Sequence, residues 1–103
     1  MLCAHTIRRL KPGTFDQFIQ TFGPPEGADP GGWVRYHVLR SLADEDEVIT
    51  FGFFDGTLAE MERSQTELGY ADQKAAIAPL VDEVLANGVY EIAVSKVVDP
   101  AAA

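Results

Sequence analysis

Residues 48–61, Val-Ile-Thr-Phe-Gly-Phe-Phe-Asp-Gly-Thr-Leu-Ala-Glu-Met, decide the fold, because a strand is followed there at once by a helix. The first seven residues are rich in β-branched and aromatic side chains, which favours a strand. An Asp-Gly pair then interrupts it. Thr57 and Glu60 have the spacing of a capping box, so a helix is predicted to begin there with Met61 facing inward.

The remaining elements are predicted from hydrophobic periodicity and from glycine and proline positions. A helix is predicted to begin at Thr14, where Thr14 and Gln17 have the spacing of a capping box. Strands are predicted over residues 2–10, 33–42 and 89–98, and a further helix over about 72–87. Residues 23–32 are predicted to form an irregular loop, and 99–103 a frayed tail. Pro79 is expected to kink or restart the last helix, and Asn87-Gly88 to end it.

This order of elements, β-α-β-β-α-β, predicts one α+β domain over residues 1–103 with a ferredoxin-like fold. The expected architecture is a four-stranded antiparallel sheet in the strand order 4-1-3-2, with the helices on one face. A chain of 103 residues is the size of a single domain, and its 47% hydrophobic content is enough for a core.

Charge and hydropathy limit the classes of partner that this chain is expected to bind. Sixteen acidic residues against eight basic ones give a net charge of -8, so nucleic acid and anionic membranes are not expected as partners. No stretch approaches the length of a membrane span, and no secretory signal is visible. We therefore expect a cytoplasmic protein.

The strands do not alternate cleanly between apolar and polar residues, as a sheet with one wet face would. In the third strand, apolar side chains point to both faces: Ile49, Phe51 and Phe53 to one, and Val48 and Phe54 to the other. Helices can cover only one of these faces. The pattern therefore predicts a homodimer that packs its two open sheet faces together, the alternative being a monomer with a partly apolar face.

The element order, the length and the junction Phe-Gly-Phe-Phe-Asp-Gly-Thr-Leu-Ala-Glu-Met resemble the dimeric α+β barrel proteins. Within this superfamily the chain is most similar to the antibiotic-biosynthesis-monooxygenase-like domains. The resemblance implies a dimer with a ligand cavity between the helices and the sheet of each subunit. Some members oxidise polycyclic phenols without a cofactor, others degrade haem, and many have no assigned activity.

This sequence differs from the family's pattern at several positions of the site. Active members often have a Trp at the end of the third strand and a His on the following helix, where this chain has Phe54 and either Arg63 or Ser64. The Asn that several members place on the first strand is absent, and the only Asn is Asn87. Haem degradation thus loses its candidate axial ligand on that helix. We expect neither a cofactor nor a metal.

Two histidines, His5 and His37, are the candidate catalytic residues. With one strand between them they are expected roughly 10 Å apart if level, too far to chelate one metal. If either faces the cavity, its imidazole could take a proton from a phenol or enol. The alternative is a hydrogen-bonded structural role.

The candidate substrate-binding residues combine aromatic surface with one cation. They are Trp33, Arg35, Phe54, Met61 and Tyr70. Core packing is the alternative for the aromatic ones. Arg35 shares a face with Trp33 and His37 by the period of two, so it could hold an anionic or phenolic oxygen in the cavity or pair with acids of a dimer partner.

Two further features, a single cysteine and an acidic run, are interpreted as structural and not functional. Cys3 is expected to be a small buried hydrophobe rather than a reactive thiol. The acidic run Asp44 to Glu47 is expected to be a solvated turn, since its spacing is not that of a calcium loop. The expected function is a cofactor-independent monooxygenase acting on a small hydrophobic aromatic or quinone-like compound. The alternatives are a non-catalytic ligand-binding dimer and a structural module.

Overall fold

The computed structural model describes residues 1–23, 27, 29 and 31–98. The strands are β1 (Leu2–Leu10), β2 (Trp33–Arg40), β3 (Glu47–Phe54) and β4 (Val81–Glu91). The helices are α1 (Phe15–Thr21), α2 (Leu58–Glu67), α3 (Tyr70–Ile77) and the 3-10 helix η1 (Ala78–Leu80). Half of the predicted loop over 23–32 and all of the predicted tail over 99–103 lie outside the described residues.

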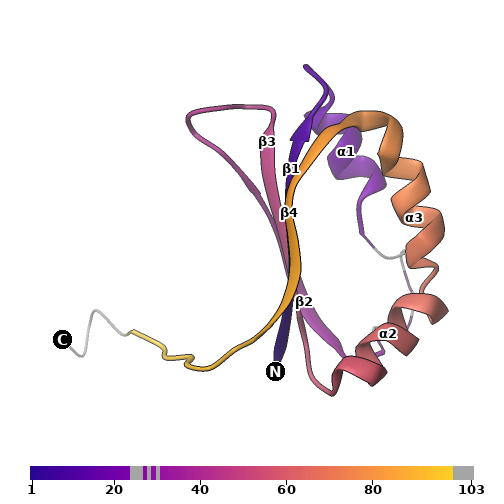
Figure 1. The fold of residues 1–103 in the computed structure, drawn as a ribbon, viewed down its shortest axis with the longest axis vertical. Helices are drawn as coiled ribbons and strands as arrows, with labels where there is room; N and C mark the ends of the chain where they lie inside the picture. Colours follow the sequence, from indigo (N-terminus) through magenta and orange to yellow (C-terminus); the bar gives the residue numbers. More distant parts are fainter. Residues whose placement is uncertain (24–26, 28, 30, 99–103) are drawn as a thin grey trace.

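The four strands form one antiparallel sheet in the order β2-β3-β1-β4, as the sequence predicted. The helices α1, α2 and α3 all lie on one side of this sheet (Figure 1). The predicted ferredoxin-like α+β fold is therefore confirmed. The strand β2 ends at Arg40, two residues before its predicted end, and β3 begins one residue early.

One of the two predicted capping boxes is present. Thr57 accepts a hydrogen bond from the Glu60 amide, and the Glu60 side chain accepts one from the Thr57 amide. The box predicted for Thr14 is wrong. The Thr14 hydroxyl instead donates to the carbonyl oxygens of Lys11 and Leu80, which ties the start of α1 to η1.

The predicted helix over 72–87 is wrong beyond residue 77. Pro79 lies in η1, and the chain continues directly as β4 with Asn87 and Gly88 inside the strand. Pairing with β1 explains the difference, because the edge of β1 that faces away from β3 carries amide and carbonyl groups that need partners. This long-range pairing overrides the local helical spacing of apolar residues.

The last predicted strand is correspondingly misplaced. β4 ends at Glu91, and residues 92–98 are described without a strand assignment. They leave the sheet on the side opposite the helices (Figure 1). Val94, Val97 and Val98 are largely exposed along this segment, which we call the C-terminal arm (residues 92–98).

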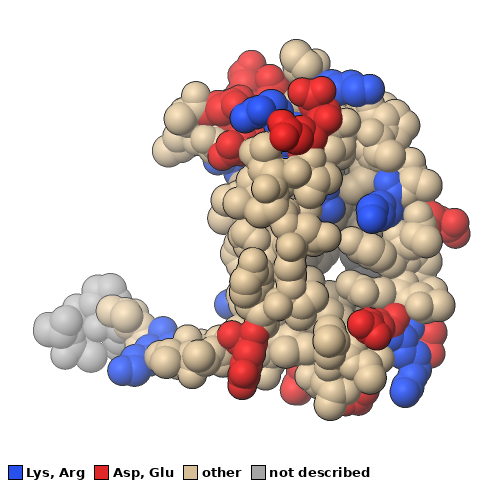
Figure 2. Space-filling model, in the orientation of Figure 1, with Lys and Arg blue, Asp and Glu red and all other residues tan. Residues whose placement is uncertain are grey.

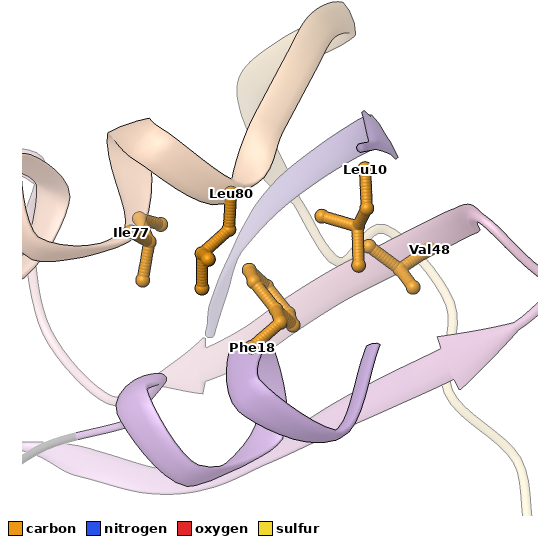
Figure 3. Close-up of a cluster of buried hydrophobic side chains, with 5 residues drawn as sticks. All are labelled: Leu10, Phe18, Val48, Ile77 and Leu80. Atoms are coloured by element: carbon orange, nitrogen blue, oxygen red, sulfur yellow. The ribbon is translucent and has the colours of Figure 1, made fainter. Parts of the chain in front are cut away.

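The main apolar core lies at one end of the space between sheet and helices. Side chains from two strands, α1, α3 and η1 meet there (Figure 3). Its buried members are Leu10, Phe18, Val48, Ile77 and Leu80. Each of them is at most 7% exposed, so this end is closed by apolar packing.

Candidate functional site

The two faces of the sheet differ in their surroundings. Residues of a strand alternate between faces, and the even-numbered residues of β1 and β3 point towards the helices. Leu10 and Val48 show this, since both pack against Phe18 of α1. We call this side the covered face and the opposite side the open face. Figure 2 shows a hollow between the sheet and the helices near the middle of the molecule.

Buried polar side chains occupy the covered face next to the apolar core. Thr6, Arg8 and Thr50 are only 9%, 6% and 4% exposed. Thr6 and Thr50 pair directly across β1 and β3, and Thr6 pairs with Asn87 of β4 on its other side. We call these four residues the polar cluster; Asn87 is its one exposed member. Polar groups buried under helices require hydrogen-bond partners.

The hydrogen bonds within the polar cluster leave mainly donors free. The Arg8 guanidinium donates from Nη1 to Thr50 Oγ1 over 2.7 Å, and Thr6 Oγ1 donates to Asn87 Oδ1 over 3.1 Å. The Thr50 proton, the Asn87 amide protons and the other Arg8 N–H groups remain. The cluster is thus suited to a ligand oxygen that accepts hydrogen bonds.

Arg8 is a buried cation in aromatic surroundings. Its guanidinium carbon lies 5.9 Å from the centre of the Phe18 ring and 5.8 Å from that of Phe22. In the described part of the chain, no carboxylate forms an ion pair with it. Burial lowers the pKa of Arg8 from its usual value, and the nearby Tyr70 phenol acts in the opposite direction.

Aromatic rings continue along the covered face. Phe22 meets Tyr36 edge-on with ring centres 5.6 Å apart, and Trp33 meets Phe54 with ring centres 5.2 Å apart. Gly52 leaves room for the Trp33 side chain, because a Cβ atom at position 52 would lie 3.0 Å from the indole ring. The polar cluster therefore lies among rings that could stack on a planar ligand.

Four of the five predicted substrate-binding residues belong to this side of the sheet. Phe54 and Met61 are fully buried, and Trp33 packs on Phe54. Tyr70, at the start of α3, lies close enough to Arg8 to act on its charge. Only Arg35 is placed elsewhere. The prediction that it shares a face with Trp33 is wrong, because the register of β2 against β3 shifts between these two residues.

Arg35 and both candidate catalytic histidines lie on the open face. His5 and His37 each pair with Phe51, so they are level with one strand between them, as predicted. His37 stacks on Phe51 at 5.0 Å, and the Arg35 guanidinium lies 5.1 Å from the centre of the Phe53 ring. The hypothesis that a histidine faces the space between sheet and helices does not fit this placement.

The polar cluster was not selected from the sequence. Thr6, Arg8 and Leu10 follow each other with a period of two, and Leu10 is apolar, so they could have been assigned to one buried face. The misplaced last strand concealed Asn87, which was interpreted as a helix end. The sequence does not predict a buried Arg8, because arginine is rarely buried without an acidic partner.

A shallow cavity of about 230 Å³ opens beside α2. It is lined by Asp29, Gly31, Ser64, Glu67 and Leu68. Ser64 of α2 is one of these lining residues. Its hydroxyl is buried and has no hydrogen-bond partner among the described residues. The structure places this serine beside the cavity.

The remaining sequence features have structural roles. Cys3 is a half-buried free thiol on the open face, and burial raises its pKa, which opposes thiolate formation. Asp44 and Asp46 hydrogen-bond within their own turn and to the Gly13 amide. Within residues 1–23, 27, 29 and 31–98, no group of three acidic, His or Cys side chains is arranged for a metal. No helix among them is long and apolar enough to span a membrane.

Comparisons with solved structures define the class of fold. The chain superimposes with a TM-score of 0.75 on a Chloroflexus aurantiacus protein that is provisionally assigned as an antibiotic biosynthesis monooxygenase, at 17% identity over 95% of this chain and 98% of that one. A mutant of SnoaB, a cofactor-independent oxygenase from Streptomyces nogalater, matches with a TM-score of 0.71 at 13% identity, over 91% and 94% of the two chains.

An uncharacterised NIPSNAP domain protein from Burkholderia xenovorans has the same fold, with a TM-score of 0.66 at 13% identity over 90% and 95% of the two chains. Neither a protein-family model nor a curated protein matches the sequence. The chain therefore has the ferredoxin-like α+β fold of the antibiotic-biosynthesis-monooxygenase-like proteins, and the predicted resemblance is confirmed for the fold.

Proposed function

We propose that this protein binds a small aromatic compound of the phenol or quinol type between its sheet and helices and oxidises it with dioxygen, without a cofactor. The observation that carries the proposal is the polar cluster, which buries hydrogen-bond donors among aromatic rings. Small-molecule sites combine an apolar lining with a few convergent polar groups. The structural neighbour SnoaB, a cofactor-independent oxygenase, supports the reaction class.

Without a cofactor, the substrate itself must supply the electrons. Loss of a proton from an activated methylene or phenol gives an anion that can pass electrons to dioxygen. For a quinol, two electrons and two protons pass to dioxygen, which gives the quinone and hydrogen peroxide. For a methylene group, one molecule of dioxygen gives one carbonyl group and one molecule of water. Both C–H bonds break, one oxygen atom bonds to the carbon, and the other oxygen atom leaves as water with the two hydrogens. The Arg8 charge favours the substrate anion, and the Thr50 hydroxyl is a second donor to its oxygen.

The proton of the substrate is proposed to pass to solvent water. His5 and His37 lie on the open face, so neither imidazole is beside the polar cluster. In this proposal the protein promotes ionisation by stabilising the product anion, because a buried positive charge lowers the pKa of a nearby acid. A histidine base is a separate hypothesis that mutation can test.

Oxygen consumption tests the oxygenase proposal. Anthrone or a naphthohydroquinone is added to the protein in an oxygen electrode. Isotope-labelled dioxygen follows oxygen incorporation into the anthrone product, and a peroxide assay follows the hydroquinone reaction. Thr50→Val removes one donor and should slow the reaction by about tenfold or more. Thr66→Val, on the exposed side of α2, is the matched control and should leave the rate unchanged. Consumption no faster than the spontaneous oxidation of the substrate would contradict the proposal.

Binding without chemistry is the second candidate function. It is favoured by the absence of both histidines from the covered face, which leaves no imidazole there to act as a base. Trp33, the only tryptophan, packs beside this space and can report ligand binding by its fluorescence. Saturable quenching by the aromatic compounds without oxygen consumption would favour this candidate.

We also propose that two copies of the chain associate through their open faces. The open face carries the partly buried rings of Phe51 and Phe53 and the half-exposed ring of Tyr90. The C-terminal arm extends on the same side and carries three exposed valines (Figure 1).

Sedimentation at micromolar concentration tests the dimer. The expected species has twice the 11.2 kDa mass of the chain. Removal of the C-terminal arm should weaken association, because it removes exposed apolar surface from the proposed contact. A single species of 11.2 kDa for the complete chain would contradict the dimer.

A further inference from the structure

We infer that the ligand is bound as an anion: an aromatic compound whose negatively charged oxygen is held by Arg8 and Thr50 of the polar cluster. This inference rests on the proposed site and names the class of compound that it accepts. The shared chemistry is an oxyanion attached to a ring, as in an aryl carboxylate or a phenolate. The neutral form of the same compound should bind much more weakly.

The charges of Arg8 and Arg9 are compensated differently. Arg9, on the open face, lies 3.5 Å from a Glu83 carboxylate oxygen and 4.0 Å from one of Asp44. Arg8 is 6% exposed and has no such partner among the described residues, although the chain contains sixteen acidic residues. A buried charge without a counter-ion is costly. An anionic ligand would supply the missing counter-ion.

Donors outnumber acceptors in the polar cluster. Arginine has five N–H donors and no acceptor, and the one bond described for the Arg8 side chain goes to Thr50 Oγ1. Thr50 accepts this bond, so its own proton is available to a ligand. Asn87 uses its oxygen towards Thr6 and keeps its amide protons. The free groups are therefore donors, which an anionic oxygen with several lone pairs can satisfy together.

Aromatic side chains surround the place that the body of the ligand would occupy. The Arg8 guanidinium lies near the Phe18 and Phe22 rings, and Phe22 in turn meets Tyr36 edge-on. A ring attached to the oxyanion would lie among these aromatic side chains. The net charge of -8 gives the protein no general attraction for anions, so selection must come from Arg8 at short range.

Calorimetric titration with matched probes tests the inference. The anionic probe is 2-naphthoate and its neutral counterpart is 2-naphthamide, while 4-nitrophenolate distinguishes a phenolate site from a carboxylate site. Wild-type protein should bind at least one anion at least about tenfold more tightly than the amide. Arg8→Gln should remove this preference. Arg9→Gln changes the net charge equally, one residue away on the other face, and should keep it.

Several outcomes would overturn the inference: equal binding of naphthoate and naphthamide, equal losses in Arg8→Gln and Arg9→Gln, or no binding of either anion to the wild type. If Arg8→Gln does not fold, as circular dichroism would show, Thr50→Val and Arg8→Lys replace it. Thr50→Val should weaken anion binding, and Arg8→Lys should keep the preference for the anion over the amide.

The proposed oxygenase and the anion site can fail separately. Oxidation of neutral anthrone at the same rate in wild type and Arg8→Gln would support the oxygenase and overturn the anion site. Arg8-dependent binding of naphthoate or nitrophenolate, with no oxygen consumption by any substrate, would support the anion site and contradict the oxygenase.

Discussion

The covered face of the sheet buries Arg8 of β1 and Thr50 of β3, whereas the open face of β3 carries Phe51 and Phe53. In a sheet that stands alone, the face under the helices is the apolar one and the other face meets water. Here the helices enclose buried polar side chains between an apolar core and aromatic rings, and further rings lie on the open face. The proposed ligand site and the proposed dimer interface both rest on this difference between the two faces.

The covered face is itself divided along its length. At one end Leu10, Phe18 and Val48 close the space by apolar packing (Figure 3). The polar cluster adjoins this end: Arg8 lies directly opposite Val48, and Thr6 and Thr50 form the next row along the sheet. A rigid apolar end next to a donor-rich middle suits a site, because the packed end fixes the strands that position the donors.

The largest effect is expected from a charge placed on the open face. Phe51→Glu should raise the dissociation constant of the proposed dimer by at least about 100-fold, because an unpaired carboxylate would be buried between two sheets. Sedimentation equilibrium measures the change. Leu42→Glu is the control, since Leu42 is fully exposed between β2 and β3. Equal dissociation constants for both variants would mean that the open face is not the interface.

A change on the covered face should stabilise the chain at the expense of the site. Arg8→Met replaces a buried cation with an apolar side chain, so the free energy of unfolding in urea should rise by about 1 kcal/mol or more. Arg9→Met, on an exposed ion pair, should change it by less than about 0.5 kcal/mol. A loss of several kcal/mol in Arg8→Met would instead make Arg8 part of the structural core.

The capping box of α2 can be removed to test how much it stabilises the helices that cover the sheet. Thr57→Ala should lower the free energy of unfolding by about 1 kcal/mol, because the Glu60 amide loses its acceptor. Thr66→Ala, on the exposed surface of the same helix, controls for the loss of a hydroxyl. Unfolding curves that coincide for both variants would show that the box does not contribute.

The same box predicts a pH dependence. The hydrogen bonds to Thr57 lower the pKa of the Glu60 carboxyl. A carboxyl whose pKa is lower in the folded state stabilises the fold above its unfolded pKa, and this contribution is lost as the pH falls through the folded value. The wild type and Glu60→Gln should therefore differ near neutral pH and converge below about pH 4. A difference that stays constant through this range would contradict the assignment.

The smallest effect is expected from the open-face histidine. His37→Ala should leave the rate of oxygen consumption unchanged, provided that it is measured at a concentration where the oligomeric state is that of the wild type. The proposed reaction takes place on the covered face, and His37 stacks on Phe51 on the opposite side. A large loss of rate with the dimer intact would make this imidazole the base and move the reaction to the open face.

Local sequence chemistry was sufficient for much of the fold. The first three strands, the Asp-Gly break and the Thr57 capping box depend on neighbouring residues, and they occur where predicted or within two residues. The segment 81–88 could not be assigned this way. Its apolar residues have helical spacing, and only the pairing needs of β1, more than seventy residues away in the sequence, make it a strand.

The candidate site was predictable only in part. The aromatic residues on the helix side were selected by type, and Trp33 and Phe54 do lie together there. The face of each strand could not be decided, because both faces carry apolar side chains. The sequence therefore favours His5 and His37 by their chemistry alone, and it shows no acidic partner that would predict a buried Arg8.

Both edges of the sheet are irregular. The register of β2 against β3 shifts between Trp33 and Arg35, and that of β4 against β1 shifts on either side of Arg8-Arg9. β2 and β4 are the two outermost strands, and an extra residue at a bulge twists an edge away from the regular ladder. Further strands therefore find no straight template at either edge. Although the helices leave one face of the sheet uncovered, its irregular edges oppose the repeated addition of strands that would produce fibres.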